Sequence, residues 1–590
     1  MKNSRTFLPN IVRGFVWLAG GMLAVTAPAH EQTLPTAGEA QALAEAGPQA
    51  ASPAQAAADT CRLHVRLQDS RSHEPIGGLV RLTPLDGGAP MMLAGLFERP
   101  AGWFSMPAVA ELKVPPGRYQ IEAIHGIDTE VARETVECRP QDAPEVVLSL
   151  VRFYDTAAEQ LHSANTHLHL LLHSGKKMGV DLGDRAEADA YLKTVGASDG
   201  LDLVYVSYLT APGAEIASNE YTDDDFTRLS EGVTRFTNGV ELRHGGKRIA
   251  DPSAVARAQS RETKLYPLDS SRSSMTYGHV LLLDLVKRSM QASVGPGLSS
   301  DPAATDGVPL RAGILDGRQQ GAGIVWCHGT MGLEAVPDWV AGVVDAQNIY
   351  DGGNEGTFDT VYYPYLNAGL KVPFSTGTDW GITDFNRVYE TSAQSFTSKT
   401  FLHELTEGRT YITNEPFLEF KAGGEPSGGT IKLESAGSIK VRGRAIGRSD
   451  FVRLQLVQDG RIVREVPSRS VGGHFEADLE VDAPVAQSGW FALRIEPIEP
   501  YEIRSRYAGR GINALGKAIF AHTSPVYVSV GGRPVCDRAA VAVLRGRVDT
   551  ALQTIDDYGT FGSDAEHAGI RKLYLEARDS LDGLLAADRR

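Results

Sequence analysis

Apolar and polar residues alternate with a period of two in the first patterned region of the chain, residues 60–150. Leu63–Leu67, Leu79–Leu82 and Tyr119–Glu122 follow this alternation, and turn clusters such as Asp86–Gly88 separate them. Because alternate side chains of a strand point to opposite faces, the pattern predicts half-buried β-strands. We therefore expect residues 60–150 to form an all-β sandwich.

Short apolar runs alternate with helical stretches across residues 151–416. Leu201–Val206 and Gly323–Trp326 are typical of buried strands, whereas Ala186–Val195 and Trp339–Ala346 have helical spacing. Alternating strands and helices favour a parallel sheet or barrel. In such folds, reactive side chains gather at the carboxyl ends of the strands.

The period of two returns over residues 417–531, for example in Ile439–Gly443 and Val452–Leu456, and predicts a second β-sandwich. Over residues 532–590 apolar residues recur at helical spacing, so we expect the chain to end in helices. The expected fold class is a multidomain protein with an N-terminal sandwich, a central parallel sheet or barrel, a C-terminal sandwich and terminal helices.

The first residues have the features of an export signal. Positive residues precede an apolar run, Phe15–Val25, and Ala27–Pro28–Ala29 has the small-x-small pattern of a cleavage site. We predict that a signal peptide, residues 1–29, is removed after Ala29 and that the protein is periplasmic or secreted. The alternative, an uncleaved anchor, is disfavoured because the run is short for a membrane span. Residues 30–59 are rich in Ala, Pro, Gln and Glu and predict a disordered linker.

Composition adds two constraints. The 590-residue chain has a formal net charge of −15, which argues against nucleic acid as a partner and leaves a small-molecule substrate as the expectation. No later stretch is apolar enough to predict membrane insertion after signal cleavage.

Cys61 and Cys138 bracket the first sandwich, and we predict a disulfide between them because exported proteins meet an oxidising compartment. Cys327 lies in an apolar run and is predicted to be a buried thiol.

The motif His167-Leu168-His169 is the first candidate for chemistry. Residues two apart in an extended backbone point to the same side, so both imidazoles can reach one cation. Imidazole is a common ligand of zinc-class metals. Two ordinary histidines would give the same pattern, so this motif alone is weak.

Further acidic and histidine residues stand beside apolar, strand-like runs. Each of them alone is equally well explained as a polar core residue with its own partner, because an unpaired buried polar group is costly. A shared metal is one partner that satisfies them all. We therefore predict these metal ligands: His167, His169, Glu241, His279, His328 and Asp379.

Longer motifs around these residues resemble one family, the polymerase-and-histidinol-phosphatase (PHP) metallohydrolase superfamily, and more closely its carbaryl-hydrolase-like (CehA/McbA-like) branch. The resemblance covers roughly residues 160–530. The motifs that carry it are Asn165–His169, Gly239–Glu241, Gly278–Leu282, Cys327–Gly329, Asn367–Gly369, Gly377–Asp379, Gly408–Pro416 and Ala521–Val528. In the first sandwich, Val114–Tyr119 resembles the PPGxY signature of carboxypeptidase-regulatory-like β-sandwiches.

The resemblance implies a distorted, TIM-like β/α barrel that holds up to three metals. The two histidines of the H-x-H motif would hold the first metal with Glu241 and Asp379, and Glu241, His279 and His328 would hold the second. Glu241 would then bridge them, and a water or hydroxide between the metals would be the nucleophile. We expect His328 and Asp379 to be catalytic residues as well as ligands. Since both ligand sets are complete, we predict two divalent ions (Zn, Mn or Fe).

Two motifs depart from the family. Its T-D-H motif is replaced here by Val206–Leu209, and its D-x-H motif reads Asp379-Trp380-Gly381, so two ligands of the third metal are missing. Only His173 could help to complete that site, and we predict that it is empty. We expect Tyr208 and Trp380 to bind the substrate as an aromatic wall that favours an apolar or aryl leaving group.

Other polar residues carry weaker predictions. Arg409 and Asn414 could contact the substrate near the mouth of the barrel, or could instead fix their loop to the C-terminal sandwich. His173, His244 and His403 are predicted to lie at the surface.

Three functions fit this sequence. The first is a metal-dependent hydrolase of an ester or carbamate. The second is a phosphoesterase, which normally needs several cations near the metals. The third is a non-catalytic periplasmic binding protein, whose ligand binding would survive removal of metal.

Overall fold

The structure is a computed structural model that describes residues 60–173, 180–209, 216–246, 275–287, 293–329, 332–351, 357–391, 395–498 and 509–587. Asp59–Arg590 forms one compact unit that is multidomain and rich in β-sheet. The predicted signal peptide and linker, residues 1–59, lie outside the described residues. Among the helices of the described ranges, none is long and apolar enough to cross a membrane.

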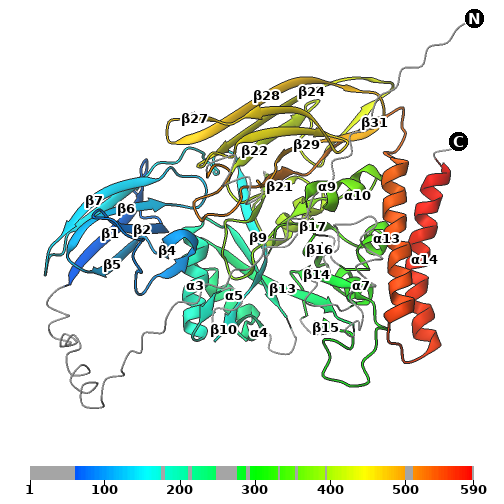
Figure 1. Cartoon of the computed structure of the whole chain (residues 1–590), viewed down its shortest axis with the longest axis horizontal. Coiled ribbons are helices and arrows are strands. Elements are labelled where there is room, and N and C mark those ends of the chain that lie inside the picture. Colours follow the sequence, from blue (N-terminus) through cyan, green and yellow to red (C-terminus); the bar gives the residue numbers. More distant parts are fainter. Residues whose placement is uncertain are drawn as a thin grey trace, which may run out of the picture. The chain divides into compact units, whose positions relative to one another are not determined.

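The N-terminal sandwich consists of two sheets with strand orders β5-β1-β8 and β3-β4-β2-β6-β7 (Figure 1). Its strands are β1 (Cys61–Asp69), β2 (Gly78–Pro84), β3 (Phe97–Arg99), β4 (Trp103–Met106), β5 (Val109–Val114), β6 (Gly117–Ile124), β7 (Ala132–Cys138) and β8 (Glu145–Leu150), with a short 3-10 turn at Pro100–Gly102. Alternate residues of β1 are buried, as the period of two predicts. The predicted disulfide between Cys61 and Cys138 is confirmed.

The central strands pair in the order β9-β12-β13-β14-β16-β17-β18, and the larger sheet that they belong to closes into a barrel. Their bounds are β9 (Leu161–His169), β12 (Leu203–Tyr208), β13 (Arg235–His244), β14 (Gly278–Leu283), β16 (Gly323–Trp326), β17 (Ala346–Asn348), β18 (Phe374–Ser375) and β19 (Asp379–Trp380). Strand β14 runs antiparallel to both of its neighbours, β13 and β16. The expectation of a parallel sheet is therefore wrong at β14, because an apolar run marks a buried strand whatever its direction.

Helices connect and cover these strands. They are α3 (Arg185–Ser198), α4 (Ala217–Glu220), α5 (Asp223–Leu229), α7 (Leu310–Gln319), α8 (Ala335–Val340), α9 (Phe358–Val361), α10 (Tyr363–Asn367) and α11 (Ser398–Thr406), with short strands β10 (Leu171–Leu172), β11 (Asp181–Leu182) and β15 (Ser293–Val294) between them. The helix predicted at Ala186–Val195 is confirmed, and the Asp184 side chain caps it by accepting from the Glu187 amide. The helix predicted at Trp339–Ala346 is wrong beyond Val340, because Gly342 has a φ of 67° and turns the chain into β17.

The C-terminal sandwich continues the central sheet by hydrogen bonding. Strand β20 (Arg387–Thr391) pairs with β9 and with β21 (Thr410–Thr413), and β21 pairs with β30 (Ala521–Thr523). The other strands on this side are β23 (Thr430–Leu433), β25 (Arg453–Gln458), β26 (Arg461–Pro467), β29 (Gly489–Ile495) and β31 (Val526–Val530). A separate sheet contains β22 (Phe417–Ala422), β24 (Gly437–Gly447), β28 (His474–Val485) and β27 (Arg469–Val471).

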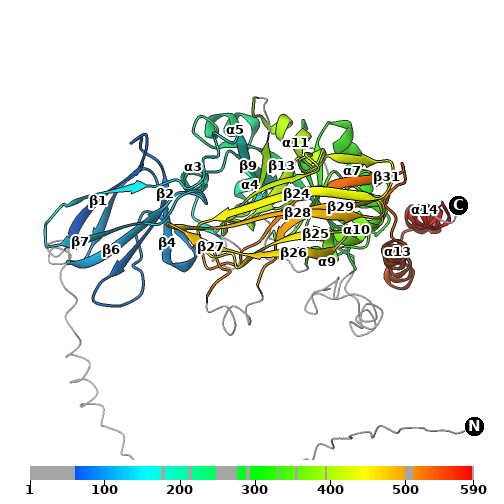
Figure 2. The same ribbon diagram turned by 90° about the horizontal axis from the view of Figure 1, so that it is seen from above.

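Two long helices end the described chain, as the sequence predicts. They are α13 (Arg538–Tyr558) and α14 (Asp564–Ala587), and they lie side by side in both views (Figure 1, Figure 2). Helix α13 packs on α10, and α14 packs on α8. The buried residues of α13, including Leu544, Val548 and Leu552, recur at the helical spacing seen in the sequence.

Candidate metal centre

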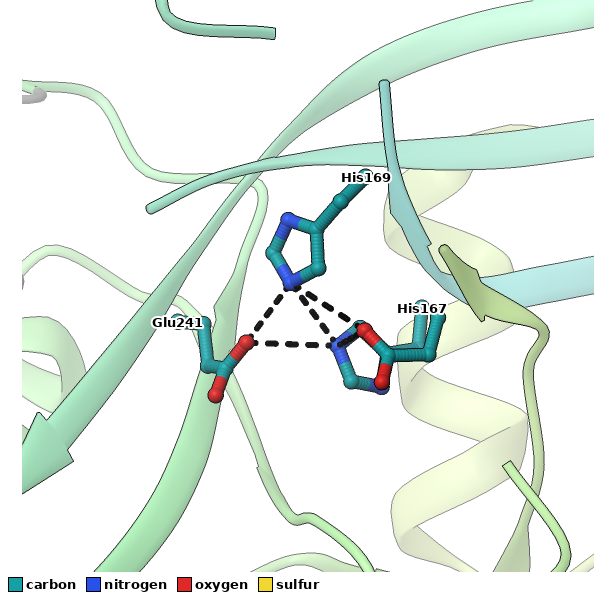
Figure 3. Close-up of side chains that lie close together, drawn as sticks. His167, His169 and Glu241 are labelled. Atoms are coloured by element: carbon teal, nitrogen blue, oxygen red, sulfur yellow. Dashed lines mark hydrogen bonds and ion pairs between the residues drawn. The ribbon is translucent and has the colours of Figure 1, made fainter. Parts of the chain in front are cut away.

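Four of the predicted ligands converge on one point, which we call the inner donor group. It consists of His167, His169, Glu241 and Asp379, whose donor atoms all lie within 4.8 Å of one another. The Nε2 atoms of His167 and His169 are 3.1 Å apart, and Nε2 of His169 is 2.6 Å from Oε2 of Glu241. Figure 3 shows the two rings and the Glu241 carboxylate pointing toward one another. Since β9 carries both histidines at a spacing of two, they reach the same side of the strand.

A second set of predicted ligands, the outer donor group, consists of Glu241, His279 and His328. The other carboxylate oxygen of Glu241, Oε1, is 2.7 Å from Nδ1 of His279. The side chains of His279 and His328 are each 14% exposed, whereas those of His167 and His169 are fully buried. The outer group is therefore the more exposed of the two, and Glu241 belongs to both groups.

Close backbone packing positions the inner group. A Cβ atom added to Gly377 would lie 2.5 Å from Cβ and 2.6 Å from the amide nitrogen of His167, so only glycine fits there. Two ligand residues have left-handed backbones, with φ values of 50° for His328 and 56° for Asp379. Such conformations cost about 1–3 kcal/mol each in residues with a side chain and concentrate at functional sites.

Hydrogen bonds on the far side of two rings fix their tautomers. Nδ1 of His167 lies 2.8 Å from Oδ2 of Asp351, and Nδ1 of His169 lies 2.8 Å from the Ser207 carbonyl oxygen. Because ionised carboxylates and carbonyls only accept, each Nδ1 carries the proton and donates it. A neutral ring in this tautomer has its lone pair on Nε2, the atom that faces the centre, as metal ligation requires.

The protonation of the ligands reflects competition between burial and charge. Burial opposes ionisation of Glu241, but His279, His167 and His169 hold its pKa well below the ordinary range. Burial lowers the pKa of His279 to about 4 in spite of the Glu241 carboxylate. Burial also opposes protonation of His328, but the charges of Asp351, Asp379 and Glu241 outweigh it and raise that pKa to about 10. A cation that binds His328 must therefore displace a proton.

The donor set fits a metal better than it fits a protein-only network. Oδ1 of Asp379 and Nδ1 of His279 are buried and have no hydrogen-bond partner of good geometry among the described residues. Leaving such atoms unpaired costs free energy, which a shared cation would recover. Mixed imidazole and carboxylate ligands accept Zn, Mn or Fe.

The three residues predicted to contact the substrate make different contacts in the structure. They are Tyr208, Trp380 and Arg409. The ring of Trp380 lies 4.9 Å from that of His169, centroid to centroid, so this aromatic surface adjoins the inner group. Tyr208 is buried at the end of β12 and donates its hydroxyl to the Tyr221 carbonyl. Arg409 pairs with Glu404, with Nη2 and Oε1 3.0 Å apart, and none of its described contacts belongs to either donor group.

The weaker predictions, for Asn414 and for three histidines, have mixed outcomes. Asn414 donates to the Ala518 carbonyl and accepts from the Phe520 amide, so it fixes its loop to the C-terminal segment, as the alternative predicted. His173 and His403 are exposed, as predicted. The surface prediction for His244 is wrong, because Nε2 of its buried ring lies 3.1 Å from Oδ1 of Asp306, a partner distant in sequence.

Sequence reasoning did not place Asp351 at the centre, and it predicted Cys327 only as a buried thiol. Asp351 contacts His167, and donor atoms of His167, Cys327 and Asp351 lie within 4.8 Å of one another. Cys327 is a buried free thiol, as predicted, and burial raises its pKa well above the ordinary value. Arg243 follows Glu241 by two residues on β13, and its Nε is 3.8 Å from Oε1 of Glu241.

Comparison with known proteins gives no family assignment. No protein-family model and no curated protein matches the chain. Solved structures match weakly: the Bacillus anthracis TIE protein (TM-score 0.13, 7% identity, 80% of this chain and 50% of that one) and the Parabacteroides merdae beta-glucuronidase (TM-score 0.16, 9% identity, 78% and 60%). The Bacteroides uniformis beta-glucuronidase is similar (TM-score 0.15, 9% identity, 80% and 61%). This chain thus spans between half and about three fifths of the length of these proteins.

Proposed function

We propose that this protein is an exported hydrolase that uses two divalent cations to attack an ester or carbamate with water. The observation that carries the proposal is the position of Glu241, whose Oε2 lies 2.6 Å from His169 and whose Oε1 lies 2.7 Å from His279. A carboxylate with one oxygen in each donor group is suited to bridge two cations. The resemblance to the PHP superfamily, which implies a PHP-type barrel, supports the same proposal.

The residues of the two donor groups and Trp380 have different roles in this proposal. Cations held by the inner and outer donor groups would supply Lewis acidity, which lowers the pKa of water and polarises a carbonyl oxygen. Glu241 and Asp379 provide the negative charge that retains the cations, and the buried rings of His167 and His169 keep water away from the inner side. His328, whose side chain is 14% exposed, is placed to orient the reacting groups. Trp380 offers an apolar face to an aryl leaving group.

One observation favours a second candidate, a phosphoesterase. The guanidinium of Arg243 lies beside Glu241, and its Nε is buried without a hydrogen-bond partner among the described residues. A fixed cation next to the metals stabilises the charge of a phosphoryl group more than that of a neutral ester. The two candidates therefore differ in how much they depend on Arg243.

The experiment measures metal content together with hydrolysis of p-nitrophenyl acetate and p-nitrophenyl phosphate. We expect about two metals per chain in the wild type, and loss of metal and of activity in His167→Ala. Arg243→Gln is the discriminating variant. If the acetate is the better substrate, its hydrolysis changes less than about 10-fold, whereas a phosphoesterase loses about 100-fold or more.

A wild type that binds no metal and hydrolyses neither compound would reject both candidates and favour the binding protein. The exposed Arg71→Gln variant serves as the matched control, since Arg71 pairs with Asp155 at the surface of the N-terminal region. It should leave metal content and both activities unchanged.

A further inference from the structure

Asp351 lies behind the two donor groups rather than in either of them. It follows β17 and is completely buried. Its Oδ2 is 2.8 Å from Nδ1 of His167, in the inner group, and its Oδ1 is 3.5 Å from Nδ1 of His328, in the outer group. One carboxylate therefore faces a ligand histidine of each group.

The surrounding chain holds this carboxylate in place. Asn348 donates its side-chain amide to Oδ2 of Asp351 at 2.9 Å. The preceding residue, Tyr350, has a left-handed φ of 58°, and its carbonyl accepts from the Asn386 side chain at 2.6 Å. Thr376 donates to the carbonyl of Ile349 at 2.7 Å. A strained turn anchored at consecutive carbonyls is a costly arrangement for a residue without a role.

The described contacts of the other two ligand histidines are of a different kind. The ring of His169 is oriented by a backbone carbonyl, which no side-chain substitution can remove. Nδ1 of His279 faces Glu241 itself. A carboxylate behind a ligand histidine fixes the orientation of the ring and strengthens it as a ligand, and its loss typically lowers metal affinity 10–100-fold.

We propose that Asp351 is a positioning residue shared by both metal sites, so that a single carboxylate sets the affinity of the inner and the outer cation together. This inference rests on the proposed function, because it presumes that the two donor groups hold metal. It adds that the sites are coupled through His167 and His328 as well as through Glu241.

The test is calorimetric titration of the metal-free full chain with Zn²⁺ and, separately, with Mn²⁺. Asp351→Ala should weaken both binding events by about 10–100-fold. The side chain of Asp351→Asn has one acceptor oxygen instead of two. It should therefore keep its contact with only one of the two histidine rings and weaken the two metal-binding events unequally. His279→Ala, which removes an outer ligand alone, should weaken only one event.

Asp306→Asn is the matched control, because Asp306 forms a buried carboxylate–histidine pair with His244 and belongs to neither donor group. It should leave both metal affinities within about twofold of those of the wild type. This result would separate a positioning role of Asp351 from a general loss of packing. If the wild type binds no metal, the proposed function fails together with the inference. If the wild type binds two metals and neither Asp351 variant changes both affinities, the inference alone is wrong. If Asp351→Ala does not fold, the unequal weakening in Asp351→Asn decides the question.

Discussion

Single residues determine how closely the strands approach the donor groups. At Gly377 the absence of a side chain lets the segment before β19 lie against the backbone of His167. Inserting a methyl group into such a contact forces the neighbouring backbone to move. Because His167 is on the other side of the contact, the displacement reaches a proposed ligand directly.

Gly377→Ala should therefore lower the free energy of unfolding by about 1–3 kcal/mol and reduce bound metal, although it touches no donor atom. Urea denaturation and metal analysis of the purified variant measure the two effects. Gly232→Ala is the control, because a Cβ atom at Gly232 meets nothing within 4 Å. A Gly377 variant as stable and as metal-loaded as the control would contradict this prediction.

Glu390 on β20 makes folding depend on pH. Both carboxylate oxygens are buried without a hydrogen-bond partner among the described residues. Burial, together with Glu404 and Asp202, raises the pKa of Glu390 from 4.5 to about 7 although Arg409 opposes the shift. Between these values the folded protein keeps a proton that the unfolded chain releases, so stability falls as pH rises through this window.

Glu390→Gln should remove this contribution. The wild type should lose more stability between pH 5 and pH 8 than the variant, as followed by urea midpoints across that range. Glu74→Gln, at an exposed position, should keep the pH dependence of the wild type. Parallel curves for wild type and Glu390→Gln would show that the carboxyl is ionised in the folded state throughout.

At this scale the sequence pointed to the residues that make up the two donor groups but not to their supports. The ligands stand beside apolar runs and belong to residue types that bind metals, so composition and position both point to them. Asp351 has no such signal, because its role depends on the left-handed turn at Tyr350 that brings it behind His167. His244 was misjudged for a similar reason, since its burial depends on Asp306.

Among the elements, β3 and α3 form a buried junction between the first sandwich and the central strands. The Arg99 guanidinium bonds both oxygens of Asp199, at 2.7 and 3.0 Å, where α3 ends. Both side chains are only 1% exposed, so neither charge can turn to water when the other is lost.

Asp199→Ala should accordingly destabilise the protein by about 3–5 kcal/mol, measured as a shift of the urea midpoint. The exposed pair of Arg71 and Asp155 gives the comparison, with less than about 1 kcal/mol expected for Asp155→Ala. The double variant Arg99→Met/Asp199→Ala should recover part of the loss, because no unpaired charge remains. Equal effects at the buried and the exposed pair would argue against a tight junction.

The existence of elements was easier to predict than their direction. Period-two alternation and short apolar runs located strands such as β1, β12 and β16, because burial on one or both faces leaves a local signature. The antiparallel course of β14 has no local signature, since it is set by hydrogen bonds to β13 and β16. The end of α8 was missed because one glycine outweighed the helical spacing around it.

Across the whole molecule, one line of hydrogen bonding runs from β9, which carries His167 and His169, to the C-terminal sandwich. β9 pairs with β20, β20 with β21, and β21 with β30. The C-terminal sandwich is therefore part of the framework that holds His167 and His169. An unpaired β21 would present an open sheet edge.

Truncation after Pro416 removes β30 and should leave a protein that aggregates and binds no metal, as size-exclusion chromatography with metal analysis would measure. Truncation after Tyr558 removes α14, which packs on α13 and α8 rather than on the strands of the metal centre. This second variant should retain its metal. A soluble, metal-loaded 1–416 fragment would mean that the sandwich is dispensable.

The donor residues are spread along the chain from β9 to β19, and no short segment contains a complete set. On the proposed function, a partly synthesised or unfolded chain lacks a complete donor set, so tight metal loading would follow the closure of the sheet. Imidazole and carboxylate donors discriminate little between Zn, Mn and Fe, so abundance at the place of folding decides which one is taken. On the proposed function, the identity of the bound metal would then record where the chain completed its fold.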